Sequence, residues 1–212
     1  MDRDPDDSQE LLRRAAAGDE AALGALWERY RTRLRQMVRL RLDRRLQGRV
    51  DPSDVLQDAY LDLAARLPEY ARDRPMPTYL WLRLVTGQRL AQVHRQHLGT
   101  AMRDAGREVS LYRGALPQAS SASLAAQLLG RFTTASQAAI RAERQLQLQE
   151  ALNGMDPMDR EILALRHFEG LSNGEAAQVL GLSQTAANNR YIRALGRLRD
   201  SLGQVPGFFD QG

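Results

Sequence analysis

The sequence predicts an all-α protein made of two small helical domains joined by a linker, with a helix-turn-helix in the C-terminal domain. Helix-forming Leu, Ala, Arg and Gln abound, Val and Ile are scarce, and only 6% of the 212 residues are aromatic. Apolar residues recur at intervals of three and four in several segments. This pattern lapses over residues 104–140, so we expect domains at 1–103 and 141–205.

The first domain begins with two predicted helices. Residues 8–17 form the first, which ends at Gly18, and Asp19 caps a second one over residues 21–42. The second helix carries a stripe typical of core packing: Leu23, Leu26, Trp27, Tyr30, Leu34, Met37 and Leu40.

A third helix is predicted over residues 52–67, with Asp51 as its N-cap and Pro52 at its first position. Its apolar side chains are Val55, Leu56, Ala59, Tyr60 and Leu63. One side of it is acidic, with Asp51, Asp54, Asp58 and Asp62. Carboxylates at this spacing repel one another slightly. The acidic side has two interpretations, a solvated face or a docking surface for a basic partner helix.

Residues 68–78 predict a Pro-rich loop with Arg72 and Arg74, and a fourth helix follows over residues 79–98. Its expected core is Leu80, Trp81, Leu84, Val85, Leu90 and Val93, and its polar residues are Arg83, Gln88, Arg89, Gln92, Arg95 and Gln96. Arg and Gln beside aromatic residues suit single-stranded nucleic acid. His94 and His97 admit a metal site, although no nearby carboxylate or cysteine supports one.

The linker is rich in Ser, Ala, Gly and Pro, with a short helix expected at 123–129. Helical signals then resume, and Asp156 and Pro157 begin the helix that leads into the helix-turn-helix. The local signals are left-handed residues at Gly170 and Gly181, a capping box at Ser172 and Glu175, and an N-cap at Ser183.

The second helix of this motif is predicted over residues 184–202. Its expected buried face is Ala187, Tyr191, Ala194, Leu195 and Leu198, and Asn188, Asn189, Ile192 and Arg193 lie mostly off that face. A two-helix unit with a short Gly-containing turn places its second helix in the major groove of DNA. The alternative is an ordinary helical hairpin with a solvated charged face.

Charge and cysteine content restrict the kinds of partner and binding site that the chain can have. The net charge is +4, and all 30 basic residues are Arg, whose planar fork suits phosphate, although codon usage in a GC-rich genome explains the absence of Lys better. A basic stretch contains Arg31, Arg33, Arg35, Arg39, Arg41, Arg44, Arg45 and Arg49. The absence of cysteine excludes disulfides and thiolate metal sites. The acidic N-terminus and the lack of a long apolar run predict a cytoplasmic protein without membrane insertion.

Four motifs in this order resemble those of one family. DVLQDAYLDL at 54–63, YLWLRLVTGQRLAQVHR at 79–95, LRHFEGLSNGEAA at 165–177 and NNRYIRA at 188–194 are similar to motifs of bacterial sigma factors of the extracytoplasmic-function type. These are two-domain subunits that direct RNA polymerase to promoters. The chain departs from the family pattern at Ala64, Gly87, Gln88, Gln92, Ala186 and Asn188, which leaves the base preferences open.

The resemblance implies three sets of binding residues. Core RNA polymerase would bind Asp51, Asp54, Gln57, Asp58 and Asp62. The melted −10 promoter strand would bind Arg72, Arg74, Gln88, Arg89, Gln92 and Arg95. The −35 duplex would bind bases through Asn188, Asn189, Ile192 and Arg193, and phosphates through Arg166, Thr185 and Arg190.

The same resemblance implies promoter recognition, promoter melting and transcription initiation without catalysis, cofactor or metal in this chain. We expect a monomer when free, and an anti-sigma factor is a common partner in the family. The alternatives are a stand-alone helix-turn-helix regulator that binds a palindrome as a dimer, an anti-sigma-like scaffold, and a metalloenzyme that uses His94 and His97.

Overall fold

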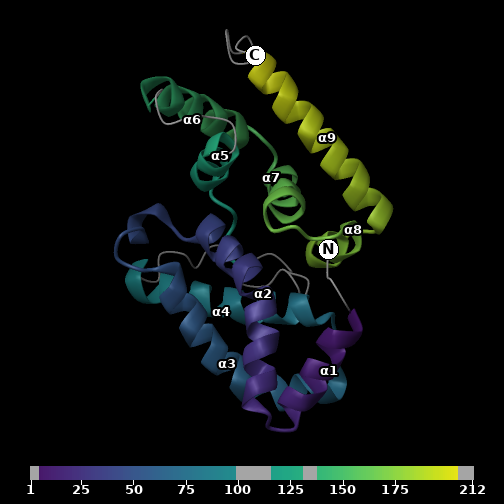
Figure 1. Ribbon diagram of the computed structural model, residues 1–212. Coiled ribbons are helices and arrows are strands. Elements are labelled where there is room, and N and C mark those ends of the chain that lie inside the picture. The colour runs from purple at the N-terminus through teal and green to yellow at the C-terminus, as the bar shows by residue number, and fades with distance from the viewer. Residues whose placement is uncertain (1–4, 99–115, 131–137, 205–212) are drawn as a thin grey trace. The chain divides into compact units, whose positions relative to one another are not determined.

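The computed structural model describes residues 5–98, 116–130 and 138–204. Two compact units divide the chain, one of residues 1–38 and 42–107 and the other of residues 39–41 and 108–212. All regular elements in the described ranges are helical (Figure 1), which confirms the predicted all-α class. No helix within those ranges is both long and apolar enough to cross a membrane.

Two helices of the first unit begin directly after the caps that the sequence predicted, whereas the first helix begins at Pro5, three residues before its predicted start. The helices of this unit are α1 (Pro5–Ala16), α2 (Glu20–Arg41), α3 (Pro52–Asp73) and α4 (Thr78–Leu98), with a short 3-10 turn, η1 (Arg44–Leu46), after α2. Asp19 accepts a hydrogen bond from the backbone N–H of Ala22 at 3.0 Å, and Asp51 accepts one from Ser53 at 2.7 Å. Gly18 has a φ of 93°, the left-handed conformation that separates α1 from α2.

Aromatic side chains join α2, α3 and α4 in the core of this unit. Trp81 is 7% exposed and stacks on Tyr70, with 4.1 Å between the ring centroids, so its prediction as a core residue is confirmed. Trp27 meets Tyr60 edge to face at 5.5 Å. Arg83 was expected on the polar side of its helix but is only 2% exposed, so that prediction is wrong.

Helix α3 is longer than the sequence predicted. It was expected to end at Leu67, before a loop from Pro68, but it continues through Pro68 to Asp73. Proline removes one backbone hydrogen bond, but a buried aromatic stack compensates here because Tyr70 packs on Trp81. The connection to α4 is therefore only the four residues 74–77.

The second unit contains α5 (Ser121–Gly130), α6 (Ala138–Asn153), α7 (Pro157–Leu163), α8 (Asn173–Leu180) and α9 (Gln184–Gly203), with a π-helical turn, η3 (Ala164–Phe168), after α7. Helix α5 confirms the short helix expected inside the linker, and it packs against α6. Helix α9 packs on α6, α7 and α8. The predicted linker therefore includes a segment that belongs to the second unit.

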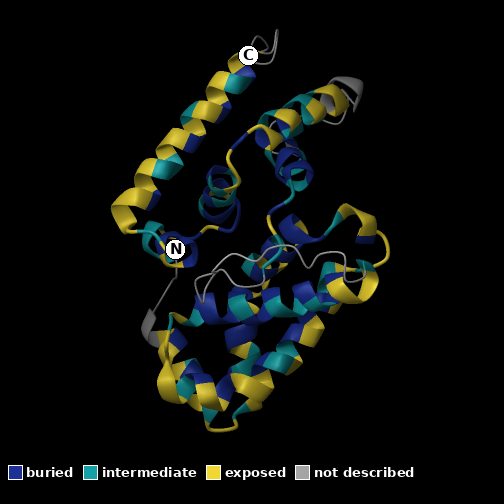
Figure 2. Ribbon diagram, turned by 180° about the vertical axis from the view of Figure 1, so that it is seen from behind, coloured by how far each residue is buried: buried dark blue, intermediate teal, exposed yellow. Residues whose placement is uncertain are grey.

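Helix α9 is buried along one side and exposed along the other (Figure 2). Its buried residues are Ala187, Ala194, Leu198 and Leu202. Leu195 was expected on this face but is 40% exposed, because it lies about 100° around the helix from Ala194. Tyr191 is half-buried at the edge of the face.

Candidate nucleic-acid and protein interfaces

The helix-turn-helix of the second unit is held by caps at both of its helices. The backbone N–H of Ser172 donates to the Glu175 carboxylate at 2.7 Å, and the N–H of Glu175 donates to the Ser172 hydroxyl at 3.2 Å. Gly181 ends α8 with a φ of 64°, and Ser183 then caps α9 by accepting from the N–H of Ala186 at 3.1 Å. Each cap was predicted from the sequence, and each is confirmed.

A second link joins α8 to α9 directly. The side-chain amide of Asn173 donates to the backbone carbonyl of Gln184 at 2.8 Å. This hydrogen bond connects the first residue of α8 to the first residue of α9. The N-terminus of α9 is therefore fixed relative to α8, as a helix that enters a DNA groove requires.

The outer face of α9 presents hydrogen-bonding side chains to solvent. Its exposed residues include Thr185, Asn188, Asn189, Ile192 and Arg193. Ile192 is 58% exposed, which is unusual for a large apolar side chain amid polar ones. Arg193 makes no ion pair with any described residue. This face is available to contact the edges of bases.

Arg190 occupies a different environment from its neighbours on α9. Its Nη1 lies 2.6 Å from Oδ1 of Asp159, in the first turn of α7, and 3.2 Å from Oδ1 of Asp156, the N-cap of that helix. The same Asp159 carboxylate binds Nη1 of Arg197 at 2.5 Å. Arg190 was predicted to bind a DNA phosphate, whereas in the structure its guanidinium forms ion pairs with carboxylates of the second unit.

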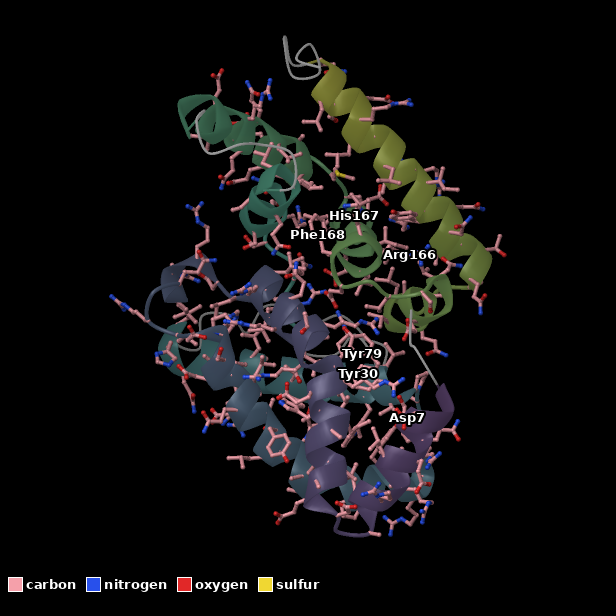
Figure 3. The ribbon with its side chains drawn as sticks, in the orientation of Figure 1. Asp7, Tyr30, Tyr79, Arg166, His167 and Phe168 are labelled. Atoms are coloured by element: carbon pink, nitrogen blue, oxygen red, sulfur yellow. The ribbon has the colours of Figure 1, made fainter. Side chains whose placement is uncertain are left out.

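Arg166 lies in the π-helical turn, beside His167 and Phe168 (Figure 3). Its Nη1 donates to the backbone carbonyl of Leu171 at 2.9 Å, and its guanidinium lies 5.3 Å from the centroid of the Tyr191 ring. Both contacts are made inside the second unit, and the side chain is half-buried. Arg166 therefore supports the segment before α8, a role that the phosphate assignment did not foresee.

The acidic side of α3 is exposed along its first three turns. Asp54, Gln57 and Asp58 are all exposed, and neither of these two carboxylates forms a salt bridge with a described residue. Leu61 lies on the same side, three residues after Asp58, and is 63% exposed. Sequence reasoning missed Leu61, although its spacing from Gln57 and Asp58 was the available signal. The surface thus combines negative charge with one apolar side chain.

Asp62 differs from the other carboxylates of α3 because it is already paired. Arg89 of α4 binds it through two parallel hydrogen bonds, Nε to Oδ2 at 2.8 Å and Nη2 to Oδ1 at 2.6 Å. The hydrogen bond to Asp62 raises the pKa of Arg89 above its ordinary value. Asp62 was predicted to bind core polymerase and Arg89 the −10 strand, but in the structure the two side chains bind each other.

The residues predicted to bind single-stranded DNA are partly engaged within the first unit. Gln88 accepts a hydrogen bond from Arg66 at 2.7 Å, and Gln92 is half-buried. The exposed cations of the set are Arg72, Arg74 and Arg95. Arg72 also lies 3.4 Å from the exposed carboxylate of Asp73. The exposed arginines of the set therefore lie before the N-terminus of α4, at Arg72 and Arg74, and in its last turn, at Arg95.

The two histidines of α4 have different surroundings. His94 is 3% exposed, and its Nε2 accepts a hydrogen bond from the backbone N–H of Asp43 at 3.3 Å. Burial lowers the pKa of His94 below its ordinary value, whereas His97 is exposed. Within the described ranges, the structure has no group of three His, Cys, Asp or Glu residues placed to hold a metal ion.

Comparison with known proteins gives consistent similarities. Residues 145–198 match the family model for sigma-70, region 4. The chain is 30% identical over 192 residues to the ECF RNA polymerase sigma factor SigD of Mycobacterium tuberculosis, with 91% of this chain and 82% of that protein covered. It is 27% identical to the RNA polymerase sigma factor NccH of Alcaligenes xylosoxydans xylosoxydans, with 92% and 94% covered.

A solved structure shares the fold. The structure of CnrH in complex with the cytosolic domain of CnrY matches with a TM-score of 0.55 and 24% identity, and the match covers 93% of this chain and 97% of that chain. The alignment thus extends over both helical units.

Proposed function

The chain belongs to the ECF RNA polymerase sigma factors, and on this premise we propose which of its surfaces bind polymerase and promoter DNA. The observation that carries the proposal is the exposed polar face of α9, whose Arg193 forms no ion pair with a described residue, on a helix-turn-helix with caps at both helices. In this proposal the chain acts in the cytoplasm, and the chemistry of RNA synthesis belongs to the polymerase.

Helix α3 docks on core RNA polymerase through Asp54, Gln57, Asp58 and Leu61, and Asp51 contributes its charge. Two observations support this assignment: these side chains share an exposed face, and the carboxylates of Asp54 and Asp58 form no salt bridge with a described residue. A basic partner surface would be attracted to the carboxylates, which speeds assembly and sets the register. Leu61 adds apolar area to the contact.

The experiment that tests this assignment is the substitution Asp58→Arg, measured as the affinity of the purified full-length chain for core polymerase. We expect at least a hundredfold loss, because an attractive contact becomes a repulsive one. Glu28→Arg is the matched control, since Glu28 is an exposed carboxylate on α2 and the change in charge is the same. Affinity of the Asp58 variant equal to that of the control would refute the assignment.

Helix α9 binds the −35 element as duplex DNA. Asn188 and Asn189 offer amides that pair bidentately with adenine, and Arg193 offers a fork that pairs with guanine, each contact contributing about 1–3 kcal/mol of discrimination. Thr185 is exposed in the first turn of α9, and we assign it to a phosphate at the helix N-terminus. Arg166 and Arg190 are left out of the primary phosphate set because their guanidinium groups have internal partners.

The −10 strand binds the first unit through the exposed cations Arg72, Arg74 and Arg95, with Gln92 one helical turn before Arg95. Gln88 and Arg89 support this surface through their contacts with α3. Trp81 does not supply a stacking platform, because it is buried against Tyr70. An anti-sigma factor remains a prediction for this chain; the fold-related CnrH was solved in complex with the cytosolic domain of CnrY.

A further inference from the structure

A cluster of ion pairs in the second unit joins α7 to α9. The carboxylate of Asp159, on α7, is 2% exposed. It receives Nη1 of Arg190 at 2.6 Å on one oxygen and Nη1 of Arg197 at 2.5 Å on the other. One buried carboxylate thus binds two arginines that lie seven residues apart, or two turns, on α9.

A third arginine lies between these two on the same flank of α9. Arg193 is three residues after Arg190 and four before Arg197, so it neighbours both. It is exposed and makes no ion pair with a described residue, whereas both of its neighbours are bound to Asp159. Without the Asp159 carboxylate, three like charges would line one flank and would repel one another, with Asp156, 3.2 Å from Arg190 Nη1, as the remaining described carboxylate beside them. Among the three arginines of this flank, Asp159 therefore leaves only Arg193 without an ion pair to a described residue.

We propose that Asp159 is a positioning residue that holds Arg190 and Arg197 away from DNA phosphates, so that α9 binds mainly through its base-contacting side chains. This proposal rests on the function of α9 as the −35 binding helix. Phosphate contacts provide affinity without sequence information, while contacts to base edges provide discrimination. Asp159 thereby restrains nonspecific binding, and by fixing α9 to α7 it also sets the orientation from which Asn188, Asn189 and Arg193 meet the bases.

The substitution Asp159→Asn keeps the shape of the side chain and removes its charge. Each arginine released toward DNA neutralises about one phosphate, which steepens the dependence of log affinity on log salt by about 0.9. We expect a slope steeper by about one to two. Binding to arbitrary sequences should strengthen, and the ratio of specific to nonspecific affinity should fall by about tenfold, since α9 also loses its anchor on α7. A residue that served stability alone would not change the slope.

The experiment uses the full-length chain and two DNA probes of 30 base pairs, a duplex selected by the wild-type protein from a random library and a scrambled version of it. Affinity is measured at several salt concentrations for wild type, Asp159→Asn and the control Glu150→Gln, which removes an exposed carboxylate of α6 that forms no ion pair with a described residue. A steeper slope and a lower ratio for Asp159→Asn alone support the proposal. Unchanged values, or a uniform loss of affinity at the wild-type slope, overturn it.

A double substitution, Arg190→Gln with Arg197→Gln, tests the proposal even if Asp159→Asn fails to fold. These arginines are bound to Asp159 rather than to DNA, so the double variant should keep the wild-type salt slope. A slope shallower by about one to two would show that they bind phosphates already, which overturns the proposal. If the wild-type chain selects no sequence at all, the −35 function of α9 fails too, and that outcome is distinct from both slope results.

Discussion

Replacing Asp62 by alanine removes one side of the ion pair that joins α3 to α4. The pair has two parallel hydrogen bonds, of 2.8 and 2.6 Å, and the side chains of Arg89 and Asp62 are 22% and 24% exposed. Exposed ion pairs contribute about 0.2–1 kcal/mol, and hydrogen bonds to charged groups about 1.5–3 kcal/mol. For this half-buried pair, screened by solvent, we expect a coupling of about 1 kcal/mol.

A double-mutant cycle measures this coupling. Asp62→Ala and Arg89→Ala should each lower the free energy of unfolding by about 1–2 kcal/mol, and the double variant should lose about 1 kcal/mol less than the sum. Both tryptophans, Trp27 and Trp81, lie in the first unit, so fluorescence during urea unfolding reports on that unit alone. Strictly additive losses would refute the pairing.

The variant Asp62→Ala also tests whether Asp62 contacts core polymerase or serves only in the ion pair with Arg89. Because Arg89 already compensates its charge, Asp62→Ala should leave the affinity for core polymerase within about twofold of wild type. Asp58→Ala, which removes a carboxylate without a salt bridge, should weaken it more. Equal losses for both variants would show that Asp62 contacts polymerase directly.

Two further predictions concern α9 and His94. The variant Ile192→Ala should lose the preference for thymine over uracil at one position of the −35 element, because the exposed Ile192 side chain can contact the thymine methyl group. Replacing each thymine by uracil in turn and measuring affinity by fluorescence anisotropy checks this prediction. A retained preference contradicts it. Burial lowers the pKa of His94 in the folded chain below the value of about 6.5 in the unfolded chain. Between these two pKa values, the unfolded chain binds more protons at His94 than the folded chain does. The free energy of unfolding therefore falls as the pH decreases through this range. His94→Gln should flatten this fall in urea titrations between pH 7.5 and 5.5, and an unaltered slope would exclude His94 as its cause; Asp43, whose pKa is lowered to about 2, stays charged throughout.

Features fixed by neighbouring residues could be predicted from the sequence. The caps Asp19, Asp51, Ser172 and Ser183 each satisfy an N–H group only two or three residues away, so the pattern of residue types was sufficient. The exposed face of α9 followed from helical periodicity for the same reason. The resemblance to the family added the assignment of each surface to a partner.

Features that depend on distant residues escaped the sequence. Asp159 and Arg190 are 31 positions apart and Asp62 and Arg89 are 27 apart, and no local pattern indicates which of many carboxylates binds which arginine. The extension of α3 beyond Pro68 likewise depends on an aromatic stack with the next helix. Three predicted binding residues, Asp62, Arg89 and Arg190, therefore form ion pairs within the protein.

Transcription with bacterial core RNA polymerase tests the central claim most directly. The purified chain is mixed with core polymerase and fragmented genomic DNA, and the 5′ ends of the transcripts are sequenced. A sigma factor with two promoter-binding units predicts discrete start sites that share a two-part sequence upstream. A folded chain that forms no stable complex with polymerase and yields no discrete starts would contradict the account.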